Sequence, residues 1–162
     1  MQSRDTQRSQ TQRPMLLQLM LAASLLVAAL VLFPLVSKIR SGGDDLVRLT
    51  NRGKFHYDKG EAARAVELFR QALALNPTHP DTLLNLANAY LLDNDTTNAL
   101  KFAQATLDLD PNSAAAHYVA GCVGLRERKY EPALKALQPA KDLEPTVGAG
   151  AFLLARAHQE LG

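Results

Sequence analysis

Four residue columns of this chain recur at a fixed spacing of 34 positions. The columns are Pro77, Pro111 and Pro145; Ala65, Ala99 and Ala133; Gly53, Ala87 and Gly121; and Leu75, Leu109 and Leu143. A period of this length that holds at several columns is an internal repeat, and each repeat is one unit that buries its apolar face against its neighbours. We therefore expect a solenoid of stacked units rather than one closed core, with function carried by binding along a surface.

Each unit has the apolar pattern of two amphipathic helices. In the second unit the two faces are Leu83, Leu86, Ala87 and Tyr90, followed by Ala99, Phe102, Ala103 and Thr106. The polar loop 93–95 separates them and supplies side chains that can cap the second helix. By the same pattern the first unit pairs residues 46–58 with 61–75, and the third pairs 113–127 with 131–143, with Asn112 as the expected N-cap. The sequence thus predicts an all-α fold.

The residues that recur resemble the signature of the tetratricopeptide repeat (TPR) family. The three copies are Gly53, Ala65, Phe69, Ala72 and Pro77; Leu83, Ala87, Tyr90, Ala99 and Pro111; and Gly121, Ala133, Leu137, Ala140 and Pro145. The resemblance implies a helix-turn-helix solenoid with repeats over residues 45–79, 80–111 and 112–145. Two departures stand out: Ala103 replaces a large residue of the signature, and Pro139 falls inside a helix, which we expect to kink and to weaken the third unit.

Residues 146–162 continue the helical pattern beyond the third repeat, with Phe152, Ala155 and Gln159 on one face. Two interpretations remain open. The segment is either the capping helix that terminal repeats need or the first helix of a fourth repeat in a longer array.

The N-terminal part of the chain has a different character. Residues 15–36 form an apolar run of 22 without a charged residue, long enough as a helix to cross the roughly 30 Å core of a bilayer. We expect a basic disordered tail at 1–14, a transmembrane helix at 15–37 that contacts the lipid bilayer, and a linker at 38–44. The alternative, a cleaved signal peptide, lacks a small-residue cleavage site after the run.

Basic residues are nearly balanced on the two sides of this run, so the positive-inside rule gives only a weak orientation. We expect the short tail to face the cytoplasm of a bacterium and the repeats to lie on the periplasmic side of its inner membrane.

Charge and composition exclude several classes of function. Residues 1–40 carry a net charge of +4 and residues 41–162 a net charge of −2, so the repeat part lacks the basic face that nucleic-acid binding needs. The chain has one cysteine and four histidines, and the histidines are spread over different units without metal-ligand spacing. We expect no metal, no cofactor and no catalytic site, hence a protein that is not an enzyme.

The TPR resemblance implies that the first helix of each unit lines a concave groove for a protein partner, held as a peptide or a helix. The residues placed there are Asn51, Lys54, Tyr57, Leu84, Asn85, Asn88, Leu91, Tyr118, Leu125, Arg126, Phe152 and Arg156. Asn51 and Asn85 are also 34 positions apart and resemble a ladder of amides that holds a peptide backbone; an ordinary surface role fits them equally well. Thr50, Ala115 and Val119 stand where the carboxylate clamp of chaperone-binding members needs basic or polar side chains.

Two hypotheses for function follow. The first is a membrane-anchored adaptor that holds a partner in its groove and assists the assembly of a complex. The second is the anchor and regulatory TPR segment of a longer enzyme whose catalytic part lies beyond residue 162.

Overall fold

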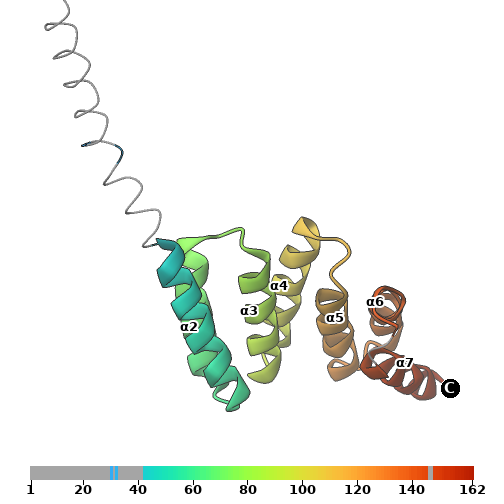
Figure 1. Cartoon of the computed structure of the whole chain (residues 1–162). Helices are drawn as coiled ribbons and strands as arrows, with labels where there is room; N and C mark the ends of the chain where they lie inside the picture. The colour runs from blue at the N-terminus through green and yellow to red at the C-terminus, as the bar shows by residue number, and fades with distance from the viewer. Residues whose placement is uncertain (1–29, 31, 33–41, 146–147) are drawn as a thin grey trace, which may run out of the picture. The chain divides into compact units, whose positions relative to one another are not determined.

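The structure is a computed structural model that describes residues 30, 32, 42–145 and 148–162. The chain divides into two units, Met1–Gly43 and Asp44–Gly162, and the second unit is the repeat domain. Its residues 44–58 are helical. Six further helices follow in chain order (Figure 1): α2 (Ala62–Leu75), α3 (Pro80–Leu92), α4 (Thr96–Leu109), α5 (Ala114–Arg126), α6 (Tyr130–Leu143) and α7 (Gly148–Leu161).

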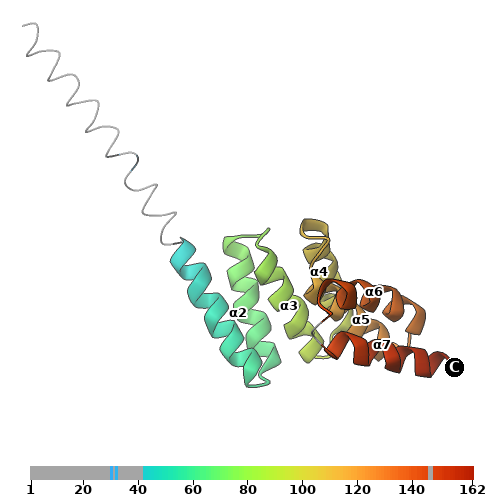
Figure 2. The same cartoon turned by 45° about the vertical axis from the view of Figure 1, so that its right-hand side comes forward.

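The helices pair as the 34-residue period predicts. The helix over 44–58 is followed by α2, α3 pairs with α4, and α5 with α6, while α7 packs against α6 (Figure 2). The turns inside the pairs share a backbone conformation although their residues differ. Gly60, Asn94 and Arg128 are 34 positions apart and all have positive φ, at 75°, 63° and 57°. The turn geometry therefore repeats although only the first unit has the glycine that suits it.

Side chains cap three of the helices at their N-termini. His79 accepts a hydrogen bond from the backbone N–H of Thr82 at the start of α3, and Asp95 accepts from that of Asn98 at the start of α4. For α5 the predicted cap was wrong by one residue, because Ser113 accepts from the backbone N–H of Ala116. Asn112 lies one position earlier in the turn, where its own N–H donates to the carboxylate of Asp110 at 3.1 Å.

Complementary side-chain volumes hold the two helices of each pair together. A Cβ atom at Gly53 would lie 2.4 Å from the ring of Phe69, and one at Gly121 would lie 2.4 Å from Leu137. In the second unit the equivalent residues are Ala87 and Ala103, both fully buried in one cluster. Ala103, which departs from the large residue of the signature, is therefore compensated by Ala87. Ala87 has a Cβ where the other two units have glycine, and the small side chain of Ala103 leaves room for it, so the close packing is kept.

The contacts between helix pairs show which side of the domain is concave. We call the helix over 44–58, α3, α5 and α7 the inner helices, and α2, α4 and α6 the outer helices. The inner helix α5 contacts both α3 and α7, whereas among the described residues α2, α4 and α6 do not contact one another. Stacked pairs that touch on one side and separate on the other curve toward the touching side, so the inner helices line the concave face.

The expected N-terminal segments mostly fall outside the described residues. This applies to the tail at 1–14 and to the transmembrane helix at 15–37, of which only Leu30 and Leu32 are described, as helical and exposed. None of the helices in the described ranges combines the length and the apolar character that crossing a bilayer requires. The linker expected at 38–44 is described only at residues 42–44, and these are helical, so helical structure begins before the predicted residue 46.

Candidate functional site

Five of the predicted groove residues are exposed on the inner helices. Asn51 and Lys54 lie on the helix over 44–58, Arg126 ends α5, and Phe152 and Arg156 lie on α7. Phe152 is 67% exposed, and among the described residues no large apolar side chain is more exposed; Leu30 has the same value. A phenylalanine held in water on the concave face is a candidate contact for a partner.

The predicted apolar groove residues of the first two units have a second role in packing. Leu84 and Leu91 of α3 are half-buried against the cluster that contains Val119 and Val123 of α5. Tyr57 is half-buried against the cluster around Phe69 and Leu86. Leu84, Leu91 and Tyr57 therefore join neighbouring units and offer only their remaining surface to a ligand. Leu125 of the third unit is also half-buried.

The asparagines of the inner face differ in their hydrogen bonds. Asn88 donates to the carbonyl of Leu84 at 3.1 Å, within its own helix. The amide nitrogen of Asn85 is buried and has no hydrogen-bond partner among the described residues, although a buried donor left unpaired costs about 1–3 kcal/mol. The residue 34 positions after Asn85 is Val119, which has no amide side chain and is 1% exposed. The pair of amides at Asn51 and Asn85 is therefore not continued in the third unit.

Arg126 is committed to a contact between repeats. Its Nη1 donates to the carbonyl oxygen of Leu91 and, at 3.1 Å, to the side-chain oxygen of Asn94. Leu91 lies in the last turn of α3, and its carbonyl oxygen also accepts a hydrogen bond from the backbone N–H of Asn94 at 3.3 Å. The guanidinium group therefore caps the end of α3 from the neighbouring unit, and Arg126 has a structural role in addition to its place on the concave face.

Tyr118 and Cys122 lie one turn apart on α5 and perturb each other. Burial, and secondarily the neighbouring Cys122, raises the pKa of the Tyr118 phenol. Burial raises the pKa of the Cys122 thiol, although contacts with Tyr118 and Arg126 oppose this. A raised pKa lowers the fraction of reactive thiolate at Cys122. Within the described ranges, no group of three or more His, Cys, Asp or Glu side chains is arranged to hold a metal ion.

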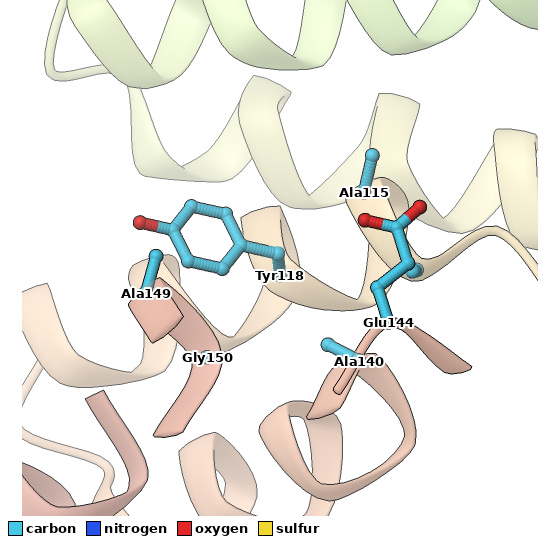
Figure 3. Close-up of a pocket in the computed structure, with 7 residues that line it drawn as sticks. Ala115, Tyr118, Ala140, Glu144, Ala149 and Gly150 are labelled. Atoms are coloured by element: carbon cyan, nitrogen blue, oxygen red, sulfur yellow. The ribbon is translucent and has the colours of Figure 1, made fainter. Parts of the chain in front are cut away.

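A cavity of about 310 Å³ opens beside Tyr118, between α5, α6 and α7 (Figure 3). Its lining is mostly apolar, and the polar side-chain groups in it are the hydroxyl of Tyr118 and the carboxylate of Glu144. The lining residues are Ala114, Ala115, Tyr118, Ala140, Glu144, Ala149 and Gly150. Sequence analysis placed only Tyr118 of these in the groove. A signal was present in the repeat, because buried Gly150 occupies the column that holds Thr82 and Ala116 in the earlier units, both fully buried. We call the contact between one helix pair and the next inner helix a junction. The third junction, where α5 and α6 meet α7, therefore has the smallest residue in this column.

Comparison with known proteins supports the fold. Residues 56–121 match the tetratricopeptide repeat family. The first TPR of Spaghetti (RPAP3), solved bound to the HSP90 peptide SRMEEVD, has a TM-score of 0.69 at 20% identity and aligns over 73% of this chain and 94% of that one. The Sgt2 TPR domain from Aspergillus fumigatus has a TM-score of 0.68 at 23% identity, over 72% of this chain and 78% of that one.

A curated relative is similar over part of its length only. The E3 ubiquitin-protein ligase CHIP of Arabidopsis thaliana is 26% identical over 114 residues, which is 70% of this chain and 41% of the ligase. The chain thus spans less than half of that relative.

The family match over residues 56–121 and the likeness in fold to solved TPR domains agree with the paired helices. The described residues of 44–162 form an all-α solenoid of helix pairs with the fold of tetratricopeptide repeat domains.

Proposed function

We propose that this chain is an adaptor that binds an extended peptide or a helix of a partner protein along the concave face of its inner helices. The observation that carries the proposal is the exposure of Phe152 on α7, an inner helix that also contributes Ala149 and Gly150 to a mostly apolar cavity. The first inner helix adds the exposed polar side chains Asn51 and Lys54. A concave, largely apolar surface with a few polar groups is the usual form of a binding site. The first TPR of Spaghetti was solved with a peptide bound, which supports the same role here.

The ligand we propose differs from the acidic HSP90 peptide of that structure. The residues that stand at the clamp positions are Thr50, Ala115 and Val119, and Val119 is buried. These positions offer no positive charge to the carboxylates of such a peptide. We therefore propose a partner segment that is mainly apolar.

The test compares variants of the concave face with matched variants of the outer helices. One chain carries Asn51→Ala, Lys54→Ala and Phe152→Ala; the control carries Arg70→Ala, Lys101→Ala and Leu100→Ala, all of which are exposed on α2 or α4. Partners captured by the unaltered chain are identified by mass spectrometry, and their binding to each purified variant is then measured. We expect the concave-face variant to lose a partner that the control retains. If both variants bind every partner equally well, the groove is not the binding site.

We further propose that residues 15–37 tether this adaptor to a bacterial inner membrane with the repeats on the periplasmic side. The support is the uncharged apolar run in the sequence. Fusions of the C-terminus to alkaline phosphatase and to green fluorescent protein test this orientation, because the first is active only outside the cytoplasm. Activity of the cytoplasmic reporter alone would reverse the orientation, and recovery of the chain without membranes would exclude the tether.

A second candidate function is a TPR segment of a longer enzyme. The observation that favours it is the match to less than half of the CHIP ligase. The intact mass of the protein in its own cells distinguishes the two, since a mass well above the 17.6 kDa of this chain favours the enzyme.

A further inference from the structure

The cavity between α5, α6 and α7 results from small side chains at one junction of the repeat. Thr82 and Ala116 are fully buried at the column that Gly150 occupies, and Thr106 is 2% exposed at the column that Ala140 occupies. The third junction has Ala140 and Gly150 where the second has Thr106 and Ala116, so both of its residues are smaller. The space beside them is lined by Ala115 and Tyr118 of α5 (Figure 3).

Gly150 is not required by the packing of the helices. A Cβ at this position would lie 3.7 Å or more from its nearest neighbours, which are atoms of Lys141. By contrast, a Cβ at Gly124 would lie 2.9 Å from the backbone of Ala133. A glycine inside a helix costs about 0.5–1 kcal/mol relative to alanine. No close approach of helices accounts for the glycine at 150, because its Cβ would make only ordinary van der Waals contact with α6, and Gly150 is part of the lining of the cavity.

The single charged group in the lining of the cavity indicates the chemistry of its occupant. Glu144 is exposed at the C-terminal end of α6 and has no ion-pair partner within the described ranges. In Figure 3 its carboxylate and Ala115 lie on the same side of the cavity. Apolar walls favour an apolar group, and a carboxylate at the same site favours a neighbouring positive charge.

We propose that this cavity binds one large apolar side chain of the partner peptide, with a lysine or arginine next to it in the peptide contacting Glu144. The inference rests on the proposed groove function, because Tyr118 belongs to both the groove and the cavity. A volume of about 310 Å³ is at the lower end of the roughly 300–1,000 Å³ of small-molecule pockets, which suits one side chain rather than a larger ligand. The cavity is thus a specificity pocket that selects peptides with an apolar residue beside a basic one.

The experiment uses four capped dipeptide amides as probes: acetyl-Phe-Lys, acetyl-Phe-Glu, acetyl-Ala-Lys and acetyl-Ala-Glu. Each is titrated into the whole, isotopically labelled chain while the backbone amide signals of Tyr118, Ala149 and Gly150 are followed by NMR. We expect acetyl-Phe-Lys to shift these signals in a saturable way, the Phe-Glu probe to bind up to about fivefold more weakly, and the alanine probes to give no saturation.

Matched glycine substitutions assign the effect to the cavity. Gly150→Thr introduces the residue that the second unit holds at this column, and we expect it to weaken acetyl-Phe-Lys binding by about tenfold or more. Gly148→Thr is the control, because it lies on the same helix with no atom within 4 Å of its Cβ. Gly150→Ala is a milder filling variant that keeps the test available if the threonine variant does not fold. Glu144→Gln should remove the preference for lysine over glutamate.

Equal binding of acetyl-Phe-Lys to the unaltered chain and to both Gly150 variants would overturn the proposal, as would the absence of any saturable shift at these three residues. Neither result affects the adaptor function, which is tested separately by loss of a partner from the triple variant of the concave face. If that variant retains its partners while the dipeptide binds at the cavity, the groove function fails and the cavity stands as a site of its own.

Discussion

At the scale of the residue, replacing a glycine by alanine has opposite expected effects on stability at two positions, depending on what the new Cβ would contact. A Cβ at Gly124 of α5 would lie 2.9 Å from the backbone of Ala133, whereas a Cβ at Gly150 of α7 would lie at ordinary van der Waals distances from Lys141. The same substitution therefore tests whether close helix approach or an unfilled space explains each glycine.

We expect Gly124→Ala to lower the free energy of unfolding by about 1–3 kcal/mol, because α6 must move away from α5. Gly150→Ala is the matched substitution and should raise the free energy by about 0.5–1 kcal/mol, since alanine favours the helix and the Cβ fits. Urea denaturation followed by far-UV circular dichroism measures both. A Gly124→Ala chain as stable as the unaltered one would contradict the close packing of α5 on α6.

The turn residue Arg128 has a φ of 57°, a conformation that costs a side-chain-bearing residue roughly 1–2 kcal/mol. Gly60 occupies the same place in the first unit without that cost. We expect Arg128→Gly to stabilise the domain by about 1 kcal/mol. The control, Arg70→Gly in the exposed surface of α2, should destabilise it by about 1 kcal/mol. Thermal denaturation shows whether the two changes have opposite signs, as the turn geometry requires.

At the scale of the element, α6 is a single helix from Tyr130 to Leu143 with Pro139 in its interior. Proline has no N–H to donate to the carbonyl four residues earlier, which is that of Lys135. We expect Pro139→Ala to raise the free energy of unfolding by about 1–3 kcal/mol. Pro132→Ala is the control, because Pro132 lies in the first turn, where proline is tolerated, and its effect should be within about 0.5 kcal/mol.

Hydrogen exchange at the amides of α6 locates the gain from Pro139→Ala. Protection should increase in α6 and α7 more than in α2. A destabilised Pro139→Ala chain would mean that the shape which proline gives to α6 is needed for its contact with α7.

The first pair of helices is joined by a pH-sensitive contact. Nδ1 of His56, on the helix over 44–58, lies 2.6 Å from the carboxylate of Glu61 at the start of α2, which Arg64 also contacts at 3.0 Å. Hydrogen bonds from His56 first, and from Arg64 second, hold the pKa of Glu61 below its ordinary value of 4.5. A depressed pKa means that the ionised carboxylate stabilises the folded state above the pKa of the unfolded chain, and that this contribution is lost as the pH falls through the folded pKa.

We therefore expect Glu61→Gln to be less stable than the unaltered chain at neutral pH, with the difference vanishing at a pH below the folded pKa of Glu61. The control is Glu131→Gln, which makes the same change on the exposed surface of α6. Thermal melting points measured from pH 7 down to the acid limit of folding give the comparison. A Glu61→Gln difference that is constant with pH would contradict the role assigned to the carboxylate.

At the scale of the whole molecule, stability and binding depend on contacts between neighbouring units. Arg126 of α5 caps the end of α3, and Leu84 and Leu91 of α3 pack on valines of α5. These contacts hold the inner helices side by side and so preserve the concave face. The residues that vary between units decide which side chains this face presents, and Thr50, Ala115 and Val119 place no positive charge at the clamp positions.

We expect the HSP90 peptide SRMEEVD, which the first TPR of Spaghetti binds in its solved complex, to show no saturable binding to this chain. Thr50, Ala115 and Val119 offer no positive charge to its carboxylates. Fluorescence polarisation with a labelled peptide measures this, with the Spaghetti domain as the positive control. Saturable binding that is lost in Lys54→Ala would contradict the prediction and indicate a clamp of different composition.

The 34-residue period determined the architecture from the sequence alone. Repeated columns specify the same local structure in each unit, so the helix pairs, the polar loop at 93–95 and the close-packing positions Gly53, Ala87 and Gly121 could be predicted. The error at Asn112 and the early start of helical structure at residues 42–44 lie at element ends, where neighbouring polar or flexible residues compete for the same role.

The candidate site could be predicted only as a face. The TPR resemblance implies that the inner helices carry it, yet the sequence does not distinguish Phe152, which is exposed, from Leu84 and Leu91, which are half-buried on α5. The capping of α3 by Arg126 and the cavity beside Gly150 also needed the tertiary structure. Burial, capping and empty space at these places depend on side chains from two or three different units at once, and those side chains do not follow the period.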